Sequence, residues 1–324
     1  MLRYLVGLSL LLVACGGPLQ GATPPPPTPP ASTGLYSCPT CTKVHTWSVD
    51  ANHRMVWDGQ PYIPVGTFWS NRQFAPATIT NFNFWIDELP SFPNLDKITN
   101  EMVAAKQTYT LVIGYPPAPR DANWIFDPTK VSTMLTQWRK YAPYVRKEGL
   151  RAVFLFNEIN WEWSWSPAHS ADQYGQKLGS LASEVREIFG VPVLYKSAGT
   201  GGGFQHVFVG ATYANGLGLD LFPQTCSTVS LPTSVRPLGL KWMAEFGKHS
   251  GAQEGSGISP FVPFASKVEL QCHIDQYLNA GFTGFFRAVM NGTDAQKRQD
   301  LQWLGELKAY IQQKVGGGTV NPCP

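Results

Sequence analysis

Residues 152–158 read Ala-Val-Phe-Leu-Phe-Asn-Glu, an almost unbroken apolar run that ends in a polar pair. Such continuous hydrophobicity is typical of a strand buried on both faces of a parallel sheet. An amphipathic stretch precedes the run at Lys130–Lys147, and another follows it at Ala171–Phe189. This order of helix, buried strand and helix predicts a parallel sheet wrapped by helices.

The same alternation extends through the rest of the chain. Further helix-like stretches are Leu95–Lys106, Phe264–Ala280 and Ala295–Val315. Besides the run above (Ala152–Asn157), the clear strand candidates are Tyr62–Thr67, Tyr109–Tyr115, Pro192–Lys196, Leu219–Pro223, Leu240–Glu245 and Thr283–Val289. An eighth strand is needed to close a barrel, and Thr78–Ile86 is the best candidate, with polar and apolar residues alternating over 81–85.

These elements predict an α/β fold, a (β/α)8 TIM barrel built as a single domain over residues 37–324. An eight-stranded barrel of typical size needs about 250 residues, which this segment supplies. The alternative architecture is an open doubly wound sheet. No glycine-rich phosphate loop follows the first strand, which disfavours that alternative.

The N-terminal residues predict export. A short basic start precedes the apolar run Tyr4–Ala14, which is too short to remain as a membrane span. The following Leu12-Val13-Ala14-Cys15-Gly16 resembles the lipobox of bacterial lipoproteins, which implies a signal peptide over 1–14 and lipidation of Cys15. An ordinary signal peptide with an incidental cysteine is the alternative. The resemblance implies a lipid-anchored protein of the bacterial cell envelope or cell surface. In such lipoproteins of Gram-negative cells, an aspartate after the cysteine favours retention in the inner membrane. Position 16 is glycine, so the outer membrane is expected if the source is Gram-negative.

Residues 15–36 are rich in proline and carry no charge, so they are predicted to form an extended linker between the anchor and the barrel. The net charge of the whole chain is only +3, and no basic run is interleaved with aromatic residues. This composition argues against nucleic acid as a partner. A monomer is expected.

Six cysteines occur in the chain, and disulfides are their expected use in an exported protein. Cys226 follows the sixth strand and Cys272 lies early in the last helix but one, so a bridge between them would pin a loop near the site. Cys323 could pair with Cys38 or Cys41. A metal site at the latter two is the competing interpretation, but no second CxxC accompanies them, and no metal is predicted.

Two predicted strands end in glutamate, at Glu158 and at Glu245 in Leu240-Lys241-Trp242-Met243-Ala244-Glu245-Phe246-Gly247. A glutamate beside so much apolar sequence is costly unless it is paired, hydrogen-bonded or protonated. The two strands are fourth and seventh in order, and working residues of such barrels lie at the carboxyl ends of strands. One protonated and one ionised carboxyl group are what glycoside cleavage requires.

Asn157-Glu158 after the fourth strand and Ala244-Glu245-Phe246-Gly247 after the seventh resemble clan A of the glycoside hydrolases. The opening Asp58-Gly59-Gln60-Pro61-Tyr62-Ile63-Pro64-Val65-Gly66-Thr67 resembles that clan's entry into its first strand. The resemblance covers roughly residues 56–309. It implies retaining chemistry with Glu158 as acid/base, Glu245 as nucleophile and Asn157 hydrogen-bonding the sugar 2-hydroxyl, without a cofactor.

Three positions depart from the clan's pattern. The arginine that usually ends the second strand is missing, with Arg72 as a nearby substitute. The sixth strand ends in Phe222-Pro223-Gln224, without the usual tyrosine or histidine. The eighth, Phe285-Phe286-Arg287-Ala288-Val289-Met290, lacks the common tryptophan. These departures keep open a barrel that binds glycan without turnover.

Aromatic side chains follow several predicted strands, and exposed rings are what sugar faces stack on. We expect some of them to bind substrate, although each could equally pack its loop onto the barrel. The tryptophans are Trp69, Trp124, Trp161, Trp163 and Trp165, and Tyr115 could add a hydrogen bond.

The sequence therefore predicts an endo-acting, retaining β-glycanase whose substrate is a polysaccharide of the mannan or glucan type. A transglycosylase that remodels envelope glycan would use the same two glutamates. A glycan-binding lipoprotein without activity is the main alternative of another class, and a structural envelope protein is a third.

Overall fold

The fold is taken from a computed structural model. It describes residues 34–37, 44–85, 92–113, 128–145, 148–155, 171–198, 214–223, 225–226, 239–249, 261–288 and 291–316.

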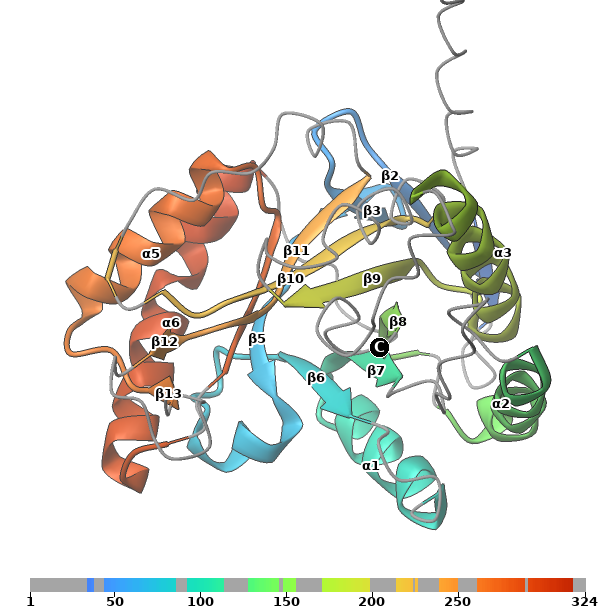
Figure 1. The fold of residues 1–324 in the computed structure, drawn as a ribbon. Helices are drawn as coiled ribbons and strands as arrows, with labels where there is room; N and C mark the ends of the chain where they lie inside the picture. The colour runs from blue at the N-terminus through green and yellow to red at the C-terminus, as the bar shows by residue number, and fades with distance from the viewer. Residues whose placement is uncertain are drawn as a thin grey trace, which may run out of the picture.

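Eight parallel strands form a closed barrel, in the circular order β10-β11-β14-β5-β6-β7-β8-β9 (Figure 1). This confirms the predicted (β/α)8 barrel, including the strand at 81–85, second along the chain, that was needed to close it. The strands are β5 (Val65–Phe68), β6 (Asn81–Trp85), β7 (Thr108–Ile113), β8 (Leu150–Leu155), β9 (Val193–Ala198), β10 (Gly216–Leu221), β11 (Leu240–Phe246) and β14 (Gly284–Arg287).

Helices surround the barrel, with α1, α2 and α3 along one side and α5 packed on α6 along another (Figure 1). Gly190 and Gly281 follow the ends of α3 and α5 and have positive φ values of 74° and 85°, which a glycine adopts without steric cost. The bounds are α1 (Phe92–Ala104), α2 (Pro128–Tyr141), α3 (Ala171–Phe189), α5 (Lys267–Asn279) and α6 (Asp294–Val315), with the 3-10 turns η1 (Trp69–Phe74) and η3 (Ala142–Tyr144).

The first predicted strand is wrong at its start. Tyr62 belongs to a separate four-stranded antiparallel sheet, and the barrel strand begins only at Val65. Pro64 lies between them and has no backbone N–H to donate to a ladder. That sheet consists of β1 (Gly34–Ser37), β2 (Val44–Val49), β3 (Met55–Trp57) and β4 (Gln60–Tyr62). A separate two-stranded sheet is formed by β12 (Lys248–His249) and β13 (Phe261–Val262).

The four-stranded sheet covers the amino-terminal end of the barrel. The hydroxyl group of Tyr62 lies 2.7 Å from Thr108 Oγ1 at the start of β7. The guanidinium group of Arg151, at the start of β8, stacks over the Trp57 ring at 4.1 Å. This end is therefore closed, which leaves the carboxyl end for chemistry.

Aromatic rings fill the middle of the barrel. Phe154, Trp242 and Phe286 come from three different strands, and their ring centroids are 6.2–6.3 Å apart. Gly218 makes room for them, because a Cβ atom there would lie 2.6 Å from the Phe154 ring. The carboxyl end thus stands on a rigid apolar layer.

In the part of the chain that the structure describes, no helix is both long enough and apolar enough to cross a bilayer.

Candidate active site

Glu245 lies near the carboxyl end of β11 and is 3% exposed. This strand is the seventh of the barrel, as the sequence predicted. Its side chain pairs with Lys196 of β9, which also pairs with Asp220 of the intervening strand β10. The burial cost that made this glutamate conspicuous in the sequence is therefore met by pairing.

Lys196 of β9 is the direct partner of Glu245. Its Nζ atom donates to Glu245 Oε2 at 2.9 Å and lies 3.0 Å from Oδ2 of Asp220 on β10. The side chains of Lys196 and Asp220 are fully buried. We call Lys196, Asp220 and Glu245 the strand 5–7 triad, because β9, β10 and β11 are the fifth, sixth and seventh strands of the barrel.

The triad carries two carboxylates around one ammonium group. Burial opposes the charge on Lys196, but the carboxylates of Asp220 and Glu245 outweigh burial and raise the lysine pKa above its ordinary value. Lys196 is therefore a cation at neutral pH.

The backbone on either side of Glu245 is held by side chains of other barrel strands. Asn83 Nδ2 of β6 donates to the carbonyl oxygen of Ala244 at 2.8 Å. Arg287 Nη1 of β14 donates to the carbonyl oxygen of Phe246 at 3.1 Å. The carbonyl groups of the two residues next to Glu245 are thus bound from two directions.

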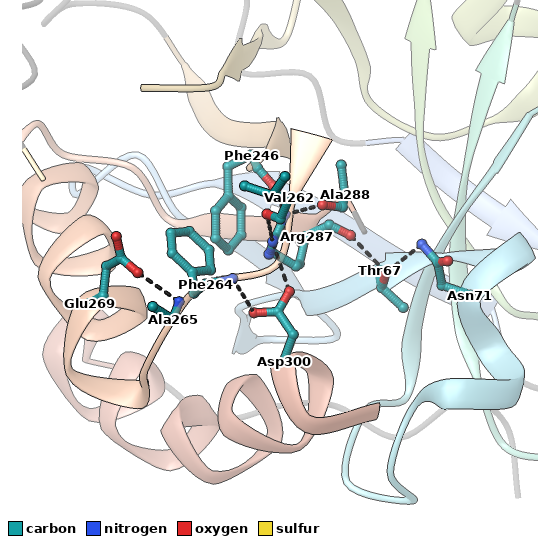
Figure 2. A network of polar contacts seen from close by, with 10 residues as sticks. All are labelled: Thr67, Asn71, Phe246, Val262, Phe264, Ala265, Glu269, Arg287, Ala288 and Asp300. Atoms are coloured by element: carbon teal, nitrogen blue, oxygen red, sulfur yellow. Dashed lines mark hydrogen bonds and ion pairs between the residues drawn. The ribbon is translucent and has the colours of Figure 1, made fainter. Parts of the chain in front are cut away.

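Arg287 points away from the barrel interior, toward α5 and α6 (Figure 2). Its Nη2 atom lies 2.7 Å from Oδ2 of Asp300 on α6, and both side chains are fully buried. The guanidinium group also lies 4.5 Å from the centre of the Phe264 ring. Burial lowers the pKa of Arg287 and raises that of Asp300, against their mutual attraction. This pair joins the last strand to the last helix.

Trp69 is the predicted substrate-binding residue that the structure describes. It opens η1 directly after β5, and its ring packs edge-on against Phe82 at 5.7 Å. Arg72 covers a face of the ring at 3.9 Å and pairs with Glu101 at 3.0 Å. Arg72 therefore contacts Trp69 and α1. Asn83 is the polar residue of the second barrel strand that reaches β11.

The other predicted site residues lie outside the described residues, and their roles stay predictions. Glu158 follows β8 by three positions in the sequence. The remaining residues in this group are Asn157, Tyr115, Trp124, Trp161, Trp163, Trp165 and the lipidation site Cys15.

The structure contains a disulfide between Cys226 and Cys272, the pairing that the sequence analysis raised. It links the segment after β10 to α5, with the two Cα atoms 6.0 Å apart. Cys38, Cys41 and Cys323 lie outside the described residues. Within the described parts, no three His, Cys, Asp or Glu side chains come together in a way that could hold a metal ion.

Sequence reasoning missed Lys196 and Asp220. Both were available to the argument that found the glutamates, since Lys196 ends one apolar strand candidate and Asp220 lies inside another. The argument considered only glutamates at strand ends. Asn83 was equally visible as a polar residue of the alternating second strand.

Fold and site together define a class: a (β/α)8 barrel with a buried, ion-paired carboxylate at the carboxyl end of its seventh strand. No family model matches the chain, and no curated protein matches it by sequence. Solved structures with the same fold include three mannanases.

The first is a β-mannanase from the blue mussel Mytilus edulis, with 11% identity, 81% of this chain and 96% of that chain covered and a TM-score of 0.52. The second is the Bacillus subtilis mannanase BCman, with 12% identity, coverage of 84% and 89% and a TM-score of 0.54. The third is the Bacillus subtilis mannanase man26, with 12% identity, coverage of 75% and 77% and a TM-score of 0.50. At such identities the likeness establishes the fold alone.

Proposed function

We propose that this protein is a retaining β-glycosidase that cleaves polysaccharide, with Glu245 as nucleophile and Glu158 as general acid/base. The observation that carries the proposal is the ion pair of the buried Glu245 carboxylate with Lys196 at the carboxyl end of the seventh strand. The nucleophile of a retaining glycosidase reacts as a carboxylate, and Lys196 holds a buried ammonium group 2.9 Å from Oε2 of Glu245.

In the proposed reaction, Glu245 attacks the anomeric carbon while Glu158 protonates the departing oxygen. Water then attacks the glycosyl ester, with Glu158 as the base, and the Glu245 carboxylate is regenerated. The strand 5–7 triad suits this cycle. When Glu245 becomes a neutral ester, Lys196 still has the carboxylate of Asp220 as its partner 3.0 Å away. The buried cation therefore keeps a partner in the intermediate.

The proposed substrates are β-mannans or β-glucans cleaved within the chain. The aromatic residues predicted to follow strands one, three and four motivate this choice, because successive sugar rings stack on such side chains. Because three solved structures with this fold are mannanases, mannan is the first substrate to test.

The test combines trapping with two variants. An activated 2-fluoro glycoside should label Glu245, and peptide mapping by mass spectrometry locates the label. Glu245→Gln and Glu158→Gln should each abolish hydrolysis. Glu184→Gln is the control and should not, because Glu184 lies exposed on α3, where it pairs with Arg139 of α2. Labelling elsewhere, or unchanged hydrolysis in both active-site variants, would contradict the proposal.

A glycan-binding barrel without turnover is the second candidate. It is favoured by the second strand, which lacks the arginine usual in the clan. Binding to a polysaccharide without release of reducing ends would support it. If instead an acceptor sugar is extended faster than donor is hydrolysed, the protein is a transglycosylase using the same glutamates.

We also propose that the barrel is tethered through lipid on Cys15, with the residues between Cys15 and the start of β1 at Gly34 as the linker. The lipobox-like sequence before Cys15 supports this. Expression in a bacterial host with a labelled fatty acid should label the parent and not Cys15→Ser. Labelling of neither would indicate an ordinary signal peptide.

A further inference from the structure

The strand that carries Glu245 contains an irregularity at Ala244. In the register with β10, Leu219 pairs with Met243 and Asp220 with Glu245, so Ala244 is skipped. In the register with β14, the pairing passes from Met243 directly to Phe246. Such bulges redirect a side chain and often lie beside active sites.

Asn83 binds the bulged residue from across the barrel. Its Nδ2 atom donates to the carbonyl oxygen of Ala244 at 2.8 Å, although β6 and β11 are not neighbours in the barrel. Asn83 is fully buried, so water does not compete for this bond. A side chain thus fixes the backbone where the regular ladder is interrupted.

Thr110 sets the orientation of the Asn83 amide. Its Oγ1 hydroxyl donates to Asn83 Oδ1, and Thr110 is itself buried on β7. Because the amide oxygen accepts from Thr110, the amide nitrogen is directed at Ala244. Hydroxyl, amide and carbonyl therefore form a chain in which each group polarises the next.

We propose that Asn83, oriented by Thr110, is a positioning residue for the nucleophile Glu245. This inference rests on the proposed function. The hydrogen bond fixes the peptide group that directly precedes Glu245, and so fixes the direction in which its carboxylate leaves the strand. A misplacement of about 1 Å in a reacting group costs up to about 100-fold in rate.

The kinetic test uses Asn83→Ala and the isosteric Thr110→Val. Both should lower kcat, by about 10–100-fold for Asn83→Ala, with KM little changed, because substrate contacts elsewhere remain. Thr110→Ser keeps the hydroxyl group and should restore kcat to near the parent value. This rescue separates the hydrogen bond from the packing of the side chain.

The chain offers a matched control two residues earlier on the same strands. Asn81 Nδ2 donates to Tyr62 Oη at 2.8 Å and also to Thr108 Oγ1, at the closed end of the barrel. Asn81→Ala and Thr108→Val should destabilise the fold to a similar degree in denaturant unfolding. Their kcat values should stay near that of the parent.

A second readout does not depend on activity. Hydrogen exchange of peptides covering 240–249 should become faster in Asn83→Ala than in Asn81→Ala. The positioning role is overturned if Asn83→Ala keeps parent kcat, or if Asn81→Ala loses as much. An inactive parent would instead overturn the proposed function, so the two failures are distinguishable.

Discussion

The Nζ atom of Lys196 lies 2.9 Å from Oε2 of Glu245, although β9 and β11 are separated in the barrel by β10. The intervening strand contributes Asp220, whose Oδ2 atom lies 3.0 Å from the same nitrogen. One buried cation is therefore shared by carboxylates from two strands. Because the pKa of Lys196 is raised, this stabilisation is present from neutral pH up to the ordinary lysine value of about 10.4, and it is lost as pH rises through the raised pKa.

Lys196→Met should destabilise the protein by about 3–5 kcal/mol, because it leaves two buried carboxylates without their cation. The free energy of unfolding, from urea titration at pH 7, is the measurement. Adding Asp220→Asn to this variant removes one of the two charges and should recover part of the loss.

Arg139→Met is the control for Lys196, because Arg139 pairs with Glu184 on the surface, where both side chains are about half exposed. Its loss should stay below about 1 kcal/mol. An equal loss in the two methionine variants would show that pairing with Lys196 contributes little to stability.

Asp300→Asn should cost about 3–5 kcal/mol, because it removes the charge that lies 2.7 Å from the buried Arg287 guanidinium. Asp294→Asn, at the exposed start of the same helix, should cost only about 0.3–1 kcal/mol through the helix dipole. Urea unfolding of both variants checks the difference. Equal losses would mean that α6 tolerates an unpaired Arg287.

The sequence located the barrel strands because buried parallel strands are continuously apolar, as in β8 and β11. The second strand was the hardest to predict, since Asn81-Phe82-Asn83 alternates. The structure gives the reason: Asn81 and Asn83 bond inward to residues of other strands, while Phe82 packs against Trp69. Polar side chains inside a barrel break the rule that identifies its other strands.

The four-stranded sheet at the amino end was not predicted. Its strands β3 and β4 are only three residues long, too short for a hydrophobic period to be recognised. Within the site, counting the predicted strands placed Glu245 at the end of the seventh, where the structure has it. The contact between Lys196 and Glu245 could not be predicted in this way. It depends on how closely β9 and β11 approach each other on either side of β10, which carries Asp220.

Cys226→Ser combined with Cys272→Ser should lower stability by about 4 kcal/mol in the chain-entropy model, because the bridge closes a loop of 46 residues. Thermal unfolding with and without reductant is the measurement. Reductant should lower the Tm of the parent toward that of the double variant and leave the variant unchanged. If reductant leaves the Tm of the parent unchanged and thiol labelling finds Cys226 and Cys272 free, the bridge is ruled out.

His273 is predicted to make the fold sensitive to acid. The residue is 1% exposed on α5, its ring lies 4.9 Å from that of Phe264, and burial lowers its pKa. Glu269 on the same helix opposes this shift, while Lys248 of β12 and Arg287 of β14 reinforce it.

As pH falls below about 6.5, the unfolded chain protonates His273 before the folded protein does, so the free energy of unfolding decreases. His273→Gln has no proton to take up and should lose less stability between pH 7 and pH 5 than the parent, in urea titrations at each pH. At pH 8 the histidine is neutral in both states, so the difference between the two proteins there records packing alone. Parallel pH profiles for parent and variant would mean that His273 is protonated equally well in the folded protein, against the burial observed.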